Sequence, residues 1–101
     1  MRLRLLDDTD SPLWDDALPE TTFRVGTAAP ADLILPRARF VELARVEFEL
    51  TPQGDALLFR HLGKPRPCVV DGKSLREGTL SAGRHLVELG PVRLTLVVEP
   101  D

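Results

Sequence analysis

Short runs of alternating apolar and polar residues recur along this chain and predict β-strands. Residues 2–6 alternate basic and apolar side chains, as a half-buried strand does. In residues 92–98 every second residue is Val or Leu, so the apolar side chains share one face. Seven glycines and nine prolines separate such runs, which favours many short strands over long helices. We therefore expect an all-β protein of about eight to ten strands.

The strongest local signal is Asp71-Gly72, which follows the strand-forming residues 68–70. Asp-Gly between two strands favours a type I′ hairpin, because the twist of that turn matches the twist of the strands. Residues 52–55, Pro-Gln-Gly-Asp, predict a second tight turn, since Pro presets its own φ and Gly accepts a positive φ. This turn is expected to join a strand at 44–50 to a partner strand at 56–62.

The segment 37–50 carries two conflicting periodicities. In its first half, Phe40, Leu43 and Ala44 have helical spacing. In its second half, three charged residues alternate with Val, Phe and Leu, as in a strand. We predict a strand over 44–50, and for 37–43 the pattern leaves open either a loop or a single helical turn.

Residues 7–21 are acidic and contain Pro12 and Pro19, and we expect them to form a loop. The first 23 residues hold six acids against two arginines. The single tryptophan, Trp14, is expected to fold back onto the domain. The net charge of −3 and a pI near 5.3 argue against nucleic acid as a partner, because such binding needs a clustered positive field.

Composition limits the remaining classes. A chain of 101 residues fits one domain, residues 1–101, with one core. No apolar run approaches the roughly 20 residues that a membrane helix needs, so we expect no membrane partner. A lone cysteine, Cys68, excludes an internal disulfide, and a cytoplasmic location is expected. Catalytic and phosphate-binding motifs are absent, and His61 and His85 lie in predicted strands, so we predict no enzyme, no metal and no cofactor.

Four motifs resemble, in order and spacing, those of forkhead-associated (FHA) domains. They are Val25-Gly26, the Asp-Leu-Ile-Leu-Pro run at 32–36, Leu62-Gly63 and Val70-Asp71-Gly72. The resemblance covers a core at 22–98, with 2–6 as the opening strand. It implies a two-sheet β-sandwich of short, mostly antiparallel strands, of the FHA/SMAD-like kind. It also implies a non-catalytic module that binds a protein or peptide partner.

The residues with which FHA domains read phosphothreonine are not matched. The family's Arg corresponds to Thr27, and the window of its Ser-x-x-His motif, 39–44, contains no Ser and no His. The family's Ser-Thr-Asn-Gly loop aligns with residues 64–67, and the chain has no asparagine. Losing two hydrogen bonds to a charged group weakens binding by roughly a hundredfold to ten-thousandfold. The resemblance therefore implies a degenerate FHA domain.

Basic residues nevertheless flank the end of the sandwich where the resemblance places the ligand. A cluster of bases can hold an anion with a different geometry, and prolines stiffen a loop while removing backbone donors. One further option is that the acidic loop folds onto these bases. The candidate residues for contact with a partner are Arg37, Arg39, Lys64, Arg66 and Thr27, with Pro65 and Pro67 supplying loop rigidity.

Three functions remain open on this sequence. The first is a protein–protein interaction module, in signalling or assembly, whose partner segment is acidic or extended and whose binding does not depend on phosphothreonine. The second is a phosphopeptide-binding FHA domain with a non-standard basic site, for which binding would depend on phosphate and fall steeply with salt. The third is a structural or oligomerisation domain that acts through sheet faces or edges.

Overall fold

The computed structural model describes residues 1–63 and 66–101. Within them all the regular secondary-structure elements are strands, and no helix long and apolar enough to cross a membrane occurs in that part. The strands are β1 (Arg2–Leu6), β2 (Pro12–Ala17), β3 (Phe23–Gly26), β4 (Leu33–Ile34), β5 (Phe48–Gln53), β6 (Ala56–His61), β7 (Cys68–Val70), β8 (Lys73–Ser74), β9 (Glu77–Leu80), β10 (Gly83–Leu89) and β11 (Val92–Glu99).

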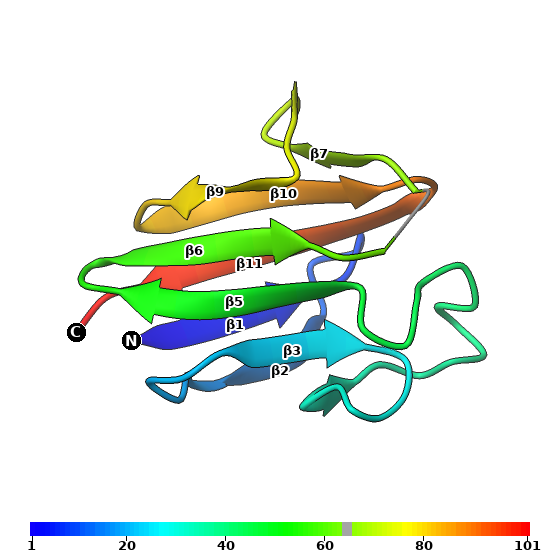
Figure 1. Ribbon diagram of the computed structural model, residues 1–101, viewed down its shortest axis with the longest axis horizontal. Coiled ribbons are helices and arrows are strands. Elements are labelled where there is room, and N and C mark those ends of the chain that lie inside the picture. The colour runs from blue at the N-terminus through cyan, green and yellow to red at the C-terminus, as the bar shows by residue number, and fades with distance from the viewer. Residues whose placement is uncertain (64–65) are drawn as a thin grey trace.

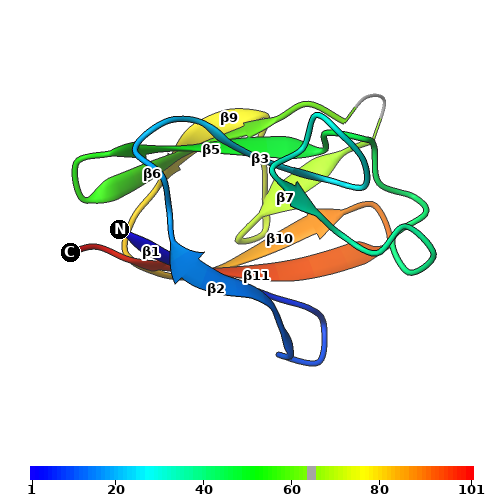
Figure 2. The ribbon, with the colours of Figure 1, turned by 90° about the horizontal axis from the view of Figure 1, so that it is seen from below.

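The strands form two sheets that pack face to face (Figure 1, Figure 2). One sheet has the order β2-β1-β11-β10-β7-β8, and the other has the order β4-β3-β5-β6-β9. Neighbouring strands are antiparallel except for β3 and β4, which are parallel. The predicted all-β, two-sheet sandwich is confirmed.

The core lies between the two sheets and follows the alternation of the strands. Leu94, Leu96 and Val98 of β11 point inward, opposite inward residues of the other sheet such as Phe48 and Phe59. The rings of these two phenylalanines stack with centroids 5.3 Å apart. Burial of such large apolar side chains is the main source of stability in a domain of this size.

The predicted Asp-Gly hairpin is confirmed. Asp71 and Gly72 both have positive φ, 52° and 81°, as a type I′ turn requires. They join β7 to β8. The turn between β5 and β6 is shorter than predicted and consists of Gly54 and Asp55, because β5 continues through Pro52. Pro52 is tolerated there because β3 pairs with β5 only as far as Leu50, so no neighbour on that side needs the missing N–H.

The expectation that residues 7–21 form a loop is wrong for 12–17, which form strand β2. This strand pairs only with β1 and is therefore a sheet edge. Its acids, Asp15 and Asp16, are exposed and discourage pairing with another chain. Trp14 packs against Phe23 of the facing sheet, with ring centroids 4.9 Å apart. The acidic segment therefore contains an edge strand, which one aromatic side chain anchors to the facing sheet.

The strand predicted at 44–50 is shifted. Strand β5 begins at Phe48, and residues 37–47 form turns and bends. In the open segment 37–43, the carbonyl of Pro36 accepts hydrogen bonds from the N–H groups of Arg39 (3.1 Å) and Phe40 (3.0 Å), so one helical turn does form. The alternation read at 45–50 breaks at Glu47, which is completely buried.

Candidate functional site

Three connections gather at the end of the sandwich opposite the two termini (Figure 1). They are residues 27–32 between β3 and β4, residues 35–47 between β4 and β5, and the described residues of the β6–β7 connection, 62–63 and 66–67. We call them together the loop end. The candidate residues Lys64 and Pro65 lie outside the described residues; the other five candidates are all on the loop end.

Thr27 points into the loop end and its polar atoms are satisfied there. Its N–H donates to the carbonyl of Arg45 (3.0 Å), and its hydroxyl donates to the carbonyl of Ala44 (3.1 Å). Only 7% of the residue is exposed. A Cβ on the preceding Gly26 would lie 1.7 Å from the Arg45 carbonyl oxygen, so the backbones touch. Thr27 therefore ties the first loop to the second and offers no free donor to a ligand.

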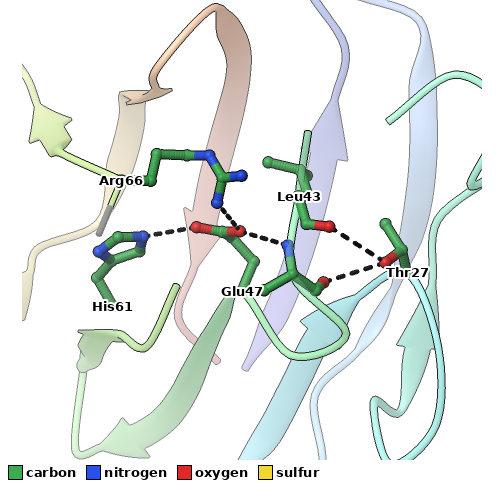
Figure 3. A network of polar contacts seen from close by, with 6 residues as sticks. Thr27, Leu43, Glu47, His61 and Arg66 are labelled. Carbon is green, nitrogen blue, oxygen red and sulfur yellow. Dashed lines mark hydrogen bonds and ion pairs between the residues drawn. The ribbon is translucent and has the colours of Figure 1, made fainter. Parts of the chain in front are cut away.

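A buried carboxylate, Glu47, lies at the centre of the loop end (Figure 3). Its Oε1 accepts hydrogen bonds from the backbone N–H of Ala44 (2.7 Å) and from Nη1 of Arg66 (2.8 Å). Its Oε2 lies 2.6 Å from Nε2 of His61. Carboxylates are almost never fully buried unless they are paired, and this one has partners on both oxygens.

Glu47 joins segments that are far apart in sequence. Ala44 belongs to the β4–β5 connection, His61 ends β6, and Arg66 precedes β7. The N–H groups of Leu62 and Gly63 donate to the Glu47 backbone carbonyl (2.9 and 3.0 Å). A Cβ on Gly63 would lie 2.0 Å from Glu47 Oε2, so only glycine fits beside the carboxylate. Both the Leu-Gly motif and the loop geometry therefore depend on Glu47.

Arg66 is turned inward by this contact. Its side chain is 22% exposed and forms an ion pair with Glu47. The neighbouring Pro67 is exposed and leads into β7. The side chain of Arg66, predicted as a candidate for partner contact, therefore has its charge compensated within the protein.

Arg39 is compensated in a similar way by Asp7. Its guanidinium forms an ion pair with the Asp7 carboxylate and stacks over the ring of Phe40, 5.2 Å from the centroid. The Asp7 carboxylate also accepts from Thr9 and Ser11 in the β1–β2 turn. These contacts, the one with Arg39 foremost, hold the pKa of Asp7 well below its usual value. One acid of the N-terminal region thus does contact a base of the loop end.

Arg37 remains the exception. It is exposed, and within residues 1–63 and 66–101 it forms no ion pair. Of the three candidate bases that the structure describes, Arg37 alone presents an uncompensated charge to solvent.

The other chemically notable side chains, Cys68, Asp71 and His85, lie in strands or in the β7–β8 turn. Cys68 is buried, and its burial raises the pKa of the thiol to about 11. His85 sits between two acceptors, with Nδ1 2.6 Å from Asp71 Oδ2 and Nε2 2.7 Å from the Ser81 carbonyl oxygen. Burial opposes ionisation of Asp71, but hydrogen bonds from His85 and the Leu86 N–H outweigh it and lower the Asp71 pKa. In the described part of the chain, no group of three potential ligands could hold a metal ion.

No family model matches this sequence, and a comparison with curated proteins finds no match. Solved structures do match. One is an FHA domain from a study of phosphothreonine-dependent FHA interactions, with a TM-score of 0.75, 19% identity and coverage of 100% of both chains. Another is the FHA domain of FhaA in complex with the intracellular domain of Rv3910, with a TM-score of 0.72, 21% identity and coverage of 93% of this chain and 98% of that one.

The same fold occurs in the cytoplasmic domain of PscD, a sorting platform protein of the type III secretion system of P. aeruginosa. Its TM-score is 0.73 at 19% identity, over 96% of this chain and 78% of that one. Together these similarities establish that the chain has the FHA fold, in agreement with the resemblance in sequence motifs.

Proposed function

We propose that this chain is a non-catalytic protein-interaction module, and that its loop end binds a protein or peptide partner without depending on phosphothreonine. We also propose that residues 1–101 form one domain. The FHA fold supports the protein-binding part, since the FhaA domain of that fold is described in complex with another protein.

The observation that supports phosphate-independent binding is that two of the three described candidate bases, Arg39 and Arg66, are paired within the protein. A phosphate needs charge-assisted hydrogen bonds from donors that are free before it binds. Arg66 is paired with the buried Glu47, and Arg39 is paired with Asp7. A phosphate would have to displace these carboxylates and leave each of them buried without its arginine, which is costly.

Three neutral donors of the loop end are also engaged. The Thr27 hydroxyl donates to a backbone carbonyl, and the N–H groups of Ala44 and Gly63 donate to Glu47. Among the described residues, Arg37 could still contribute one contact to a phosphate, and this contact supports a non-standard phosphopeptide site. A single exposed charge contributes about 1 kcal/mol or less in such a setting, too little to make binding depend on phosphate.

The test is calorimetric titration of a degenerate phosphothreonine peptide library and its unphosphorylated twin, at low and moderate salt. The variant Arg37→Ala removes the candidate base that has no ion pair among the described residues, and Arg93→Ala, which changes an exposed arginine of β11, serves as its control. We expect binding of both libraries with similar affinity. Binding of the phosphorylated library alone, lost in Arg37→Ala and retained in Arg93→Ala, would replace this proposal by the phosphopeptide function.

A further inference from the structure

The ring of His85 lies between two acceptors that come from different parts of the chain. Its Nδ1 is 2.6 Å from Oδ2 of Asp71, in the β7–β8 turn. Its Nε2 is 2.7 Å from the backbone carbonyl oxygen of Ser81, in the connection between β9 and β10. Only 9% of His85 is exposed. The ring therefore links a turn of the six-stranded sheet to the connection that joins the two sheets.

These two contacts require two protons on the ring. A neutral imidazole has one N–H group and one bare nitrogen, whereas the imidazolium has two N–H groups. A carbonyl oxygen can only accept a hydrogen bond, and so can an ionised carboxylate. Burial opposes ionisation of Asp71, but hydrogen bonds from His85 and from the Leu86 N–H outweigh it and lower the Asp71 pKa. With Asp71 ionised, a neutral His85 would turn a lone pair towards one of its two acceptors.

The contact with Ser81 is the one that a neutral ring gives up. A hydrogen bond to a charged acceptor is the stronger one, so the remaining proton stays on Nδ1, against the Asp71 carboxylate. The carboxylate itself is held in place, because its Oδ1 accepts from the Leu86 N–H (2.9 Å) and the Asp71 N–H donates to the Leu86 carbonyl (2.9 Å). The proton on Nε2 is therefore the one that leaves to solvent, and the bare nitrogen then faces the Ser81 carbonyl.

The sign of the pH dependence follows from these protonation states. Both contacts are present while His85 carries two protons, and the Ser81 contact is lost as the pH rises through the range in which a histidine loses a proton, near pH 6.5 for an ordinary ring. On the acid side, Asp71 stays ionised to below the ordinary carboxyl pKa of 3.8, because its own pKa is lowered.

Few other charges face the ring. A hollow of about 460 Å³ lies beside it, between the β7–β8 turn and β9. Apart from His85, the charged residues in its wall are Asp71 and Lys73, and the others are Ala56, Val70, Leu75, Thr79, Leu80 and Ser81. On the neighbouring strand β11, the uncharged Leu96 lies opposite His85. Arg84, next to His85 on β10, pairs with Asp10. Among the described residues, Asp71 is thus the one carboxylate that contacts the ring.

We propose that His85 is a proton-dependent clamp: with both ring nitrogens protonated it ties the Asp71 turn to the Ser81 connection, and loss of the Nε2 proton releases that connection. Ser81 and the preceding Leu80 form part of the wall of the hollow, so release opens the hollow to solvent. His85 lies near the start of β10, at the end of the sandwich that carries the termini (Figure 1). This inference is therefore independent of the function proposed for the loop end.

The experiment is an NMR titration of the isotope-labelled chain from about pH 5 to about pH 9, a range that spans the ionisation of histidine. Long-range ¹H–¹⁵N spectra of the imidazole rings report which nitrogens carry protons, and the ¹³C signal of the Ser81 carbonyl reports its hydrogen bond. The variant Asp71→Asn is measured alongside, because Asn tolerates the positive φ of 52° at this position. Its amide can donate to a bare Nδ1, so a neutral ring keeps its proton on Nε2, against Ser81. The other histidine, His61, contacts Glu47 at the loop end and is the internal control.

In the wild-type chain we expect both nitrogens of His85 to be protonated at the acid end and Nδ1 alone at the alkaline end. The Ser81 carbonyl and the Leu80 methyl signals should shift with the same midpoint as His85. In Asp71→Asn the neutral ring should carry its proton on Nε2, and the Ser81 signal should stay constant. A neutral wild-type ring with its proton on Nε2, or a Ser81 signal that stays constant or follows His61, would overturn the clamp. Constant Leu80 signals would overturn the opening of the hollow.

Discussion

Removing the Glu47 carboxylate is the perturbation with the largest expected effect on the loop end. In Glu47→Ala, the N–H of Ala44 and the ring of His61 lose a buried acceptor, and Arg66 loses its partner. A buried donor left without a partner costs about 1–3 kcal/mol, and removal of one member of a buried ion pair costs about 3–5 kcal/mol in total. We therefore expect the free energy of unfolding to fall by about 3–5 kcal/mol.

Urea unfolding followed by circular dichroism measures this difference. With an m-value of about 2 kcal/mol per molar urea, the midpoint should fall by about 2 M. Glu49→Ala is the matched control, because Glu49 is two residues away, on β5, and also pairs with arginines. Those pairs lie on the solvent face, so their loss should cost less than about 1 kcal/mol.

The milder variant Glu47→Gln keeps the shape of the side chain and removes its charge. It should lower the free energy of unfolding by about 1.5–3 kcal/mol, the contribution of a hydrogen bond to a charged group. This variant is measured instead if Glu47→Ala does not fold. Equal midpoints for the Glu47 and Glu49 variants would refute the conclusion that Glu47 holds the loop end together.

Three further predictions concern single residues. Gly63→Ala should destabilise the protein by about 2 kcal/mol or more in thermal or urea unfolding, since its Cβ would collide with Glu47; an unchanged midpoint contradicts the close contact. Asp7 has a folded-state pKa below the ordinary value of 3.8, so the stability it adds through Arg39 is present above that pH and is lost as pH falls towards the folded-state pKa. The Tm difference between wild type and Asp7→Asn should accordingly shrink below about pH 4, whereas a constant difference would argue against the ion pair. Cys68, buried and with a thiol pKa of about 11, should react with a thiol reagent at neutral pH only as the protein unfolds; rapid labelling of the native protein would show that the site is open.

Features encoded by neighbouring residues could be predicted from the sequence. The Asp71-Gly72 hairpin depends on two adjacent residues that accept positive φ, and it was predicted with the correct turn type. The apolar face of β11 and the opening strand β1 follow from simple alternation over a few residues. The order of the Gly-containing motifs was sufficient to indicate the fold.

Features that depend on distant contacts could not be predicted in this way. Strand β2 carries acids because it is a sheet edge, and the same acids are typical of a loop. In the sequence, Glu47 fits the alternation of charged and apolar residues that predicts a strand. Its burial is favourable only because His61 and Arg66, from the other side of a hairpin, contact its carboxylate. For the same reason, the sequence did not indicate that two candidate bases are paired within the protein. Each arginine is remote in sequence from the carboxylate that it contacts.

Binding of phosphothreonine itself tests the central claim most directly. Free phosphothreonine is titrated into isotope-labelled protein, and the amide signals of Thr27, Ala44 and Arg66 are followed by NMR. Because the donors at these positions are already engaged within the protein, we predict no saturable shift of the three signals. Saturable shifts centred on them would contradict the claim and would show that the loop end still reads phosphate.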